Sequence, residues 1–418
     1  MKSGIMHHIV AAAGRDRRIL GLSALVSLII LLLTYILGNT PYAMPGDHAA
    51  LDDINDFKTF IGSRTDNMPD SLLLVNVCYD KQMVSYEENG MPVGEIVITN
   101  REKLLKLLTI AREADNYRYL FLDILFDKGI KTPVDSALFH TIASMDRIII
   151  PSHKGIELQD SILYAKAANA DYSVNWKVLI FSRYQFLRDD SVQTVPLKMY
   201  ADNMHIDGHG IEPHWGGLWY TDAGKLCQNG ITLYQRVVIR DRLQEQEGQA
   251  REFSYSYLGA DLLDQDSLLP VKEQIQDKIV VIGDFKEDRH VTYLGSQPGT
   301  VVCLNAYLAL MAGDHLVNWW FVCVLFLIYM IVGTFYLKGN SFSSLFRRPW
   351  LCVLMSFLST ATLFFIISLV ASWYEMAFNI WVPTTVYSLI DTYVQKRNLY
   401  KEKKNEKAIS TTVAKPAG

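Results

Sequence analysis

The sequence lacks the short motifs that mark the common classes of enzyme. It contains no G-x-S-x-G elbow, no H-E-x-x-H and no S-x-x-K, and it has neither a P-loop nor a G-x-G-x-x-G turn. Charged residues make up only 20% of the 418 residues, and the net charge is -4 without a sustained basic face. We therefore expect no enzyme, no cofactor and no nucleic-acid partner.

Cysteine and glycosylation signals are also sparse. The chain has five cysteines, of which only Cys78, Cys227 and Cys303 lie outside long apolar runs. So few and so widely spaced cysteines do not form a disulfide framework, although one disulfide bond among them is kept as an alternative. No N-x-S/T acceptor occurs between the first two apolar runs. This absence favours a bacterial envelope over a eukaryotic secretory pathway.

What the chain does have is long hydrophobic runs. Each of four runs is long enough to cross a bilayer as a helix, namely residues 19–37, 319–337, 350–371 and 376–393. Pro383 interrupts the last run, and Asp391 lies near its end, where we expect it to reach the membrane interface. The runs leave an amino-terminal segment (1–18), a large domain (38–318) and a basic tail (394–418).

The distribution of lysine and arginine sets the expected orientation in the lipid bilayer. Basic residues precede the first run, separate the second from the third and follow the fourth, whereas the loop at 372–375 has none. Positively charged flanks stay in the cytoplasm, so we expect both termini inside. The domain at 38–318 is then expected on the periplasmic side of a bacterial inner membrane.

Within this domain, strand and helix patterns alternate. Apolar runs rich in strand-forming residues occur at 72–79, 119–125, 147–150 and 278–282, with further strands expected at 178–181 and 231–239. Helical periodicity covers 101–114, capped by Asn100, and helices are also expected at 135–144 and 300–311. The order predicts an α/β domain with a mostly parallel sheet, followed by a helix that leads directly into the second span.

Two blocks of this domain resemble the CHASE2 domain, an extracytoplasmic sensory module of bacterial receptors. The first block, 119–151, carries Asp123, Ile124, Leu125, Phe126, Asp135, Leu138 and Pro151. The second block, 278–316, carries Ile282, Gly283, Thr292, Pro298, Gly299, Asn305, Ala306 and Gly313. Where the family tends to have Glu-x-His-Ala-Asn, this chain has Val302, Cys303 and Leu304 before Asn305.

The resemblance implies a periplasmic sensor with one anchor before the domain and three helices after it. Family members usually continue into a kinase or cyclase, whereas here a short lysine-rich segment follows residue 393. A separate partner protein would then report the sensed state. Sensors with this layout often act as dimers, so a homodimer is considered, although no heptad seam is visible.

Candidate ligand-binding residues follow from the strand ends. Asp123 and Asp127 lie at the carboxyl end of an expected parallel strand, where open α/β sheets bind ligands, and Asp135 follows nearby. Gly283 and Asp284 end the last strand on the same side, and Asn305 belongs to the second resembling block. Capping, pairing inside the fold and plain turn geometry are the alternatives for these residues.

A loop rich in histidine offers a second candidate site. His205, Asp207, His209 and His214 lie close together on a segment with glycine and proline, and they include ligand types that zinc prefers. The spacing matches no known metal motif, so an ordinary surface loop is the alternative.

Three functions are weighed on this basis. The preferred hypothesis is a non-catalytic inner-membrane protein that binds a small molecule or a protein partner in the periplasm and relays that state through its membrane helices. The alternative is a structural subunit of an envelope complex that docks through aromatic residues around Trp215, Trp219 and Tyr220. A periplasmic enzyme is the third and rests only on the crevice of the sheet.

Overall fold

The computed structural model of the protein divides into two compact units. The α/β unit comprises Asn39–Ala43 and Asp56–Leu316, and the helical unit comprises Met1–Gly38, Met44–Asn55 and Val317–Gly418. The structure describes residues 2–40, 71–88, 91–171, 183–188, 192–204, 210–233, 236–237, 256–263, 269–292, 295–340, 349–373 and 379–413.

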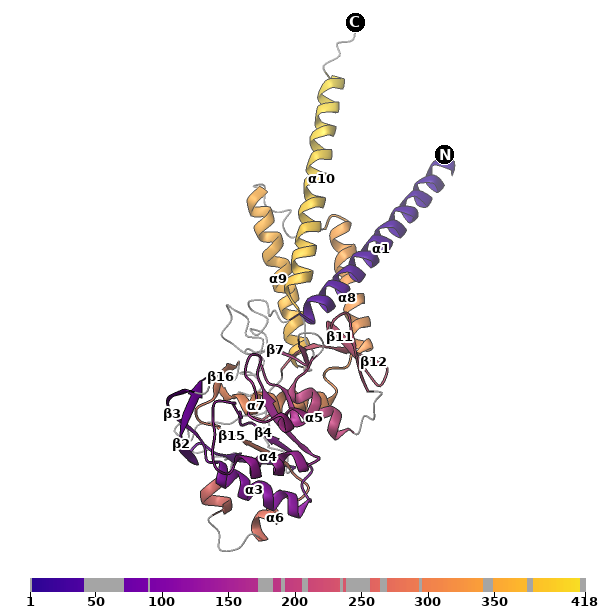
Figure 1. Cartoon of the computed structure of the whole chain (residues 1–418). Helices are drawn as coiled ribbons and strands as arrows, with labels where there is room; N and C mark the ends of the chain where they lie inside the picture. Colours follow the sequence, from indigo (N-terminus) through magenta and orange to yellow (C-terminus); the bar gives the residue numbers. More distant parts are fainter. Residues whose placement is uncertain are drawn as a thin grey trace, which may run out of the picture. The chain divides into compact units, whose positions relative to one another are not determined.

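A parallel sheet of six strands forms the centre of the α/β unit (Figure 1). Its spatial order is β14-β1-β15-β4-β5-β6, so that β15 returns late in the chain and lies between β1 and β4. This arrangement confirms the expected mixed α/β fold with a parallel sheet. The strands are β1 (Leu72–Asn76), β4 (Tyr119–Leu122), β5 (Ile148–Ser152), β6 (Ala167–Asn169), β14 (Ser256–Tyr257) and β15 (Ile279–Gly283).

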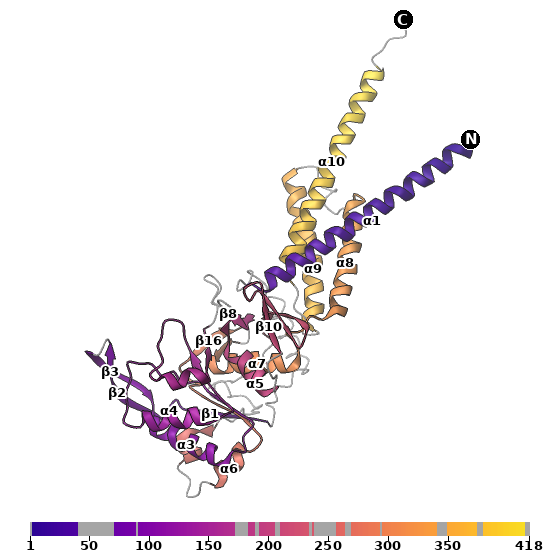
Figure 2. The ribbon, with the colours of Figure 1, turned by 45° about the vertical axis from the view of Figure 1, so that its right-hand side comes forward.

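Helices cover both faces of this sheet (Figures 1 and 2). On one face α3 (Arg101–Ala114), α4 (Asp135–Ser144) and α6 (Leu269–Ile275) share a core with Leu73 and Val75 of β1. On the other face α5 (Val195–Asn203) and α7 (Gly299–Ala312) share a second core with the alternate residues Leu72 and Leu74. Both sides of the strands are thus buried, which explains their continuous apolar sequence.

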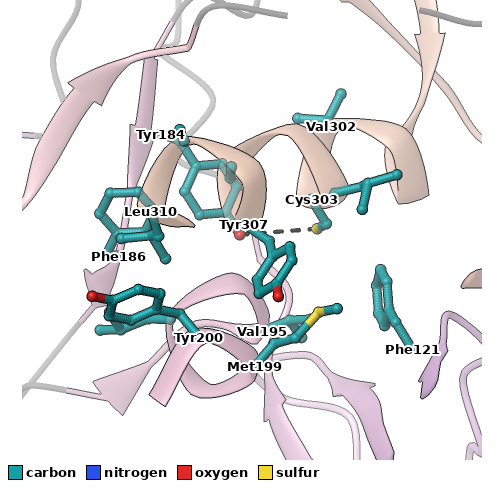
Figure 3. Packing of buried hydrophobic residues seen from close by; sticks show 14 of the residues in the cluster. Phe121, Tyr184, Phe186, Val195, Met199, Tyr200, Val302, Cys303, Tyr307 and Leu310 are labelled. Atoms are coloured by element: carbon teal, nitrogen blue, oxygen red, sulfur yellow. Dashed lines mark hydrogen bonds between the residues drawn. The ribbon is translucent and has the colours of Figure 1, made fainter. Parts of the chain in front are cut away.

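The second core encloses α7 almost completely. Figure 3 shows Tyr307 and Leu310 of this helix packed among aromatic residues of neighbouring segments, with the Tyr184 hydroxyl 3.9 Å from the Cys303 sulfur. Residues 299–307 of α7 are all buried, which fits a helix that is apolar on all sides.

Local sequence explains where several helices begin. Asn100 accepts a hydrogen bond from the backbone N–H of Lys103 at 3.0 Å and so caps α3, as its position in the sequence predicts. The apolar residues Leu104, Leu107, Leu108 and Ala111 then lie on one buried face. The observed bounds of α3, α4 and α7 agree with the expected helices to within one residue.

Smaller sheets surround the central one, and the sequence patterns did not predict most of them. Residues 178–181, expected as a strand, lie outside the described residues, and the strand expected at 231–239 is described as a strand only up to Thr232. The smaller sheets pair β2 (Lys81–Glu88) with β3 (Met91–Thr99), β7 (Arg183–Gln185) with β13 (Gly230–Thr232), β8 (Leu187–Arg188) with β9 (Val192–Gln193), β16 (Arg289–Thr292) with β17 (Gly295–Pro298), and β10 (Ile211–His214) with β11 (Trp219–Asp222) and β12 (Lys225–Gln228).

The helical unit contains α1 (Lys2–Gly38), α8 (Trp319–Leu337), α9 (Pro349–Trp373) and α10 (Trp381–Val413). Within the described part of the chain, three helical segments are long and apolar enough to cross a membrane: Asp16–Gly38, Trp319–Leu337 and Leu354–Ala371. Their shared core includes Ile30, Leu325, Tyr329, Phe364 and Tyr387. The chain is therefore compatible with a membrane protein, whereas α10 does not meet the same standard of apolarity.

α10 differs from the fourth span expected at 376–393. It begins at Trp381 and continues without a break to Val413, so the segment that follows residue 393 is helical as far as Val413. Pro383 lies in the first turn, where its missing N–H disrupts no helical hydrogen bond, so it does not interrupt the helix. Asp391 is buried, with 1% of its surface exposed, instead of reaching an interface.

The structure also shows the exposure of the aromatic residues at 215–220 and the state of the cysteines. Trp215 is 80% exposed and contacts the ring of Trp219 at 4.8 Å, but Tyr220 is fully buried in the core. Cys78, Cys227 and Cys303 are buried free thiols, so the described structure has no disulfide among them.

Candidate functional site

The candidate site lies where β4 ends at the carboxyl edge of the sheet. Asp123 follows this strand, and its Oδ2 accepts a hydrogen bond of 2.5 Å from the hydroxyl of Thr300 in the first turn of α7. The backbone N–H of Asp123 donates to the carbonyl of Ile282 in the neighbouring strand β15. A carboxylate is therefore held at the amino end of a buried helix, where the helix dipole favours negative charge.

Burial raises the pKa of Asp123 to about 6, and the negative charge of Asp288 acts in the same direction. The Thr300 hydrogen bond and the charges of His153 and His290 oppose this rise. Each histidine is itself beside a carboxylate: His153 Nδ1 lies 2.9 Å from Asp171, and His290 Nε2 lies 3.4 Å from Asp288. Two histidine–aspartate pairs thus act electrostatically on Asp123.

Gly283 explains how α7 comes so close to the end of the sheet. A Cβ atom at this position would lie 2.4 Å from the Thr300 hydroxyl oxygen and 3.1 Å from its Cβ. The glycine therefore allows another segment of the chain to approach the backbone, one of the two roles that its position suggests. The absence of a side chain at Gly283 leaves the space that Thr300 occupies in its contact with Asp123.

Asp284, the next residue, is tied to the fold. It forms an ion pair of 2.6 Å with Lys81 and accepts hydrogen bonds from the backbone N–H groups of Lys286 and Glu287. Burial works against the charged form, but these bonds together hold the pKa of Asp284 below its usual value. Asp284 closes a turn beside the site.

Asp127 and Asp135 do not converge on Asp123. Asp127 accepts a hydrogen bond of 2.7 Å from the backbone N–H of Gly129 and stabilises a local turn. Asp135 is buried and forms an ion pair of 2.6 Å with Arg101, which is itself only 2% exposed. It also accepts hydrogen bonds from Thr132 and Gln159, so both of its oxygens are used inside the fold.

Asn305 is also used inside the fold. It is fully buried in α7, and its side-chain oxygen accepts hydrogen bonds from the backbone N–H groups of Arg236 and Val237 at 2.6 and 2.8 Å. Its amide group donates to the carbonyls of Val237 and Val301. The side chain holds residues 236–237 against the helix, and its hydrogen-bonding capacity is largely filled.

The histidine-rich loop lies mainly outside the described residues. His205, Asp207 and His209 belong to an undescribed segment, while His214 is in β10 with its Nε2 at 3.2 Å from the Thr221 hydroxyl. Among the residues that the structure describes, no group of three or more His, Cys, Asp or Glu side chains is arranged to hold a metal ion.

Sequence patterns missed several residues of the site. Thr300, His153 and His290 come from α7, from the end of β5 and from β16, and only the fold brings them to Asp123. His153 follows β5 at the same edge of the sheet as Asp123 follows β4, so the strand-end rule could have identified it. No local signal indicates Thr300, which is separated from Asp123 by 177 positions.

A second buried polar group lies after the other end of α7. His315 is 1% exposed, and its Nε2 lies 3.2 Å from Asp222, which also accepts a hydrogen bond of 2.8 Å from Tyr200. Burial lowers the pKa of His315, so the imidazole is neutral. The carbonyl of His315 accepts a hydrogen bond from Gln228, which ties the segment after α7 to β12.

The arrangement at Asp123 can bind a small polar molecule. The Asp123 carboxylate can accept hydrogen bonds, and it already accepts one from the Thr300 hydroxyl. No protein-family model matches the chain, and neither curated proteins nor solved structures give a match.

Proposed function

We propose that the chain is a non-catalytic inner-membrane protein whose α/β unit, a CHASE2-like sensor, faces the periplasm. The unit binds a small solute that donates hydrogen bonds, such as a polyol or an amine, at Asp123. The bound state passes through α7 to the membrane helices and from there to a separate partner protein.

The observation that carries this proposal is the path of α7. Its first turn holds Thr300 against Asp123, and a helix of 14 residues transmits displacement as a rigid body about 20 Å long. Its carboxyl end is closed by Gly313 in a left-handed conformation, and α8 begins at Trp319. A ligand that competes with Thr300 for Asp123 would act directly on the element that leads into the helical unit.

The orientation rests on the charge pattern together with the helices. Three helical segments meet the length and apolarity of membrane spans, and α10 is proposed as the fourth because its amino-terminal half contributes to the same core. Basic residues at the ends of these helices then place both termini in the cytoplasm.

Cysteine labelling tests this orientation. In spheroplasts, a membrane-impermeant maleimide should label Trp215→Cys, because this position is 80% exposed in the α/β unit. Lys404→Cys, at an exposed position of α10, should be labelled only after permeabilisation. The reverse pattern would exclude a periplasmic domain.

Ligand binding is tested by thermal unfolding of the full chain in the presence of a panel of polyols, sugars and amines. A ligand that binds only the native state stabilises it and raises the Tm, and the rise grows with the logarithm of the ligand concentration once this exceeds Kd. We expect one chemical class to raise the Tm of the wild type and of the control Asp127→Asn, but not of Asp123→Asn. A panel without effect, or an effect that persists in Asp123→Asn, contradicts the site.

The second candidate function is a structural subunit of an envelope complex. Exposed Trp215, whose ring lies tilted against that of Trp219, is the observation that favours it, because exposed tryptophan anchors many protein interfaces. Purification from native membranes separates the two functions. A stoichiometric partner set that is lost with Trp215→Ala but unaffected by Asp123→Asn supports the structural subunit.

A further inference from the structure

α10 carries a regular row of exposed side chains on one side. The row consists of Leu389, Tyr393, Lys396, Tyr400 and Lys403, all of which are exposed. Their spacing of four, three, four and three residues keeps them on one side of the helix. The row runs about 21 Å along the helix, at a rise of 1.5 Å per residue. Its composition changes in that direction from leucine through tyrosine to lysine.

A second, shorter row of cations flanks the first. Arg397 and Lys404 are exposed, and each directly follows a lysine of the first row. Their spacing of seven residues places them on neighbouring turns of the same side. Two adjoining rows thus present four cations, and neither row contains an acidic residue.

The opposite side of this part of α10 faces the end of α8. A Cβ atom at Gly339 would lie 3.1 Å from the Asn398 side-chain nitrogen and 3.9 Å from a methyl carbon of Val394. Glu402 follows Asn398 by four residues and so lies near the same side. The four cations therefore point away from α8. Membrane orientation depends on how many cations a segment has and does not require them on one side of a helix, so this separation of charge has another cause.

The order of residues along the first row matches the layers of a bilayer surface. Exposed leucine suits the hydrocarbon layer, tyrosine is enriched at the interface, and lysine and arginine reach the headgroups with their long side chains. Lys403 lies about 10 Å further along the helix than Lys396. This distance is close to the Debye length of about 8 Å, within which a charged membrane surface attracts cations.

We propose that Tyr393, Lys396, Arg397, Lys403 and Lys404 form a basic face that binds the phosphate groups of anionic phospholipids. The attraction is electrostatic and selects lipids with a net negative charge, because the headgroup cation of a zwitterionic lipid offsets its phosphate. An acidic protein surface would match the cations but not the leucine and tyrosine that precede them in the row. The proposal rests on the proposed function only in taking α10 as the fourth membrane helix.

Native mass spectrometry of the full chain in detergent tests the basic face. Phosphatidylglycerol is compared with phosphatidylcholine as the anionic and the zwitterionic lipid. We expect the wild type to bind phosphatidylglycerol more tightly, and each lost cation should weaken this binding about fivefold at low ionic strength. The preference should disappear in a variant that combines Lys396→Gln, Arg397→Gln, Lys403→Gln and Lys404→Gln.

Two control variants separate the basic face from net charge. Lys128→Gln with Lys225→Gln removes two exposed cations of the α/β unit and should leave the preference unchanged. Lys403→Asn with Asn405→Lys keeps the net charge but moves one cation about 200° around the helix. We expect this exchange to weaken phosphatidylglycerol binding as much as Lys403→Gln alone does. Binding equal to that of the wild type would show that only total charge matters, which contradicts a specific face.

Two further outcomes overturn the proposal. One is equal binding of both lipids by the wild type, or a preference that persists in the fourfold variant. The other is unchanged lipid binding in the fourfold variant together with loss of a stoichiometric partner from native membranes, which would assign the face to an acidic protein. Lipid binding in detergent does not depend on orientation, so a reversed cysteine-labelling pattern would contradict the periplasmic domain and leave the lipid preference intact.

Discussion

Buried polar side chains are satisfied differently in the two units of this chain. In the α/β unit, Arg101 and Asp135 bind each other and several neighbours, and Asn305 makes four hydrogen bonds to the backbone. In the helical unit, Thr384 and Ser388 are as deeply buried but have no such partners among the described residues. Residues of the first kind hold the fold, whereas residues of the second kind leave hydrogen-bonding capacity unused within the described residues.

The largest expected effect breaks the buried ion pair of the α/β unit. Arg101→Met leaves the Asp135 carboxylate buried without its cation and should lower the free energy of unfolding by about 3–5 kcal/mol. Chemical denaturation of the full chain in detergent measures this loss. Lys128→Met is the control, since both partners of the Lys128–Glu157 pair are about 70% exposed and solvent screens such a pair, so its loss should change stability little. Equal losses in the two variants would show that Arg101 is not a structural charge.

The second expected effect concerns the protonation of Asp123 in the α/β unit. Because the pKa of Asp123 is about 6 in the folded state and 3.8 for an aspartate in the unfolded chain, the folded state binds the proton more tightly than the unfolded state. The free energy of unfolding should therefore fall as the pH rises from about 4 to about 6, by at most about 3 kcal/mol at 1.36 kcal/mol per pKa unit.

Asp123→Asn removes this dependence, and Asp127→Asn should keep it. Buried His315 contributes a slope of the opposite sign, because its lowered pKa makes stability rise with pH up to the unfolded value of 6.5. The difference between wild-type and Asp123→Asn curves, measured by denaturation at each pH, cancels that contribution. A difference that does not vary with pH is incompatible with a raised pKa at Asp123.

The third effect sharpens the role of Asn305. Asn305→Ala leaves the backbone N–H groups of Arg236 and Val237 without their acceptor and should cost about 2 kcal/mol. Hydrogen exchange at these two amides should accelerate more than exchange in α3, which packs on the opposite face of the sheet. Unchanged exchange at 236–237 would mean that other contacts hold this segment.

The smallest effect is expected on α10. Ser388→Ala removes a hydroxyl that has no protein partner and should change the free energy of unfolding by less than about 0.5 kcal/mol. Thr360→Val is the matched change on α9, and it should cost about 1 kcal/mol because Thr360 bonds to Tyr336 and Ser356. Thermal unfolding in detergent compares the two. A larger loss for Ser388→Ala would place this residue among the structural polar groups.

The parts of the fold that depend on local sequence were predictable. α3 has its cap and its apolar face within the helix itself, and β1, β4 and β15 are continuous apolar runs with polar ends. The β2–β3 hairpin and the β10–β12 sheet have no comparable local signal. In β3 the side chains from Met91 to Glu95 are all exposed, so apolar and polar residues do not alternate with burial.

The candidate site was predictable only in part. The rule that ligands bind beyond the carboxyl ends of parallel strands identifies Asp123, but it selects Asp127 equally well, and Asp135 was added only because it follows nearby. The pairing of Asp135 with Arg101, which lies 34 positions earlier on α3, appears only in three dimensions. On α10 the spacing of Thr384, Ser388, Asp391 and Gln395 is visible in the sequence, and helical periodicity could have identified this polar face.

The length of α10 affects how far a local change is felt. From Asp391 to Val413 the helix continues for 22 residues, which is about 33 Å. A tilt of the buried part by about 10° would move the distal end of a helix of this length by about 6 Å. A rearrangement smaller than a side chain would thereby become a displacement that a neighbouring protein could detect.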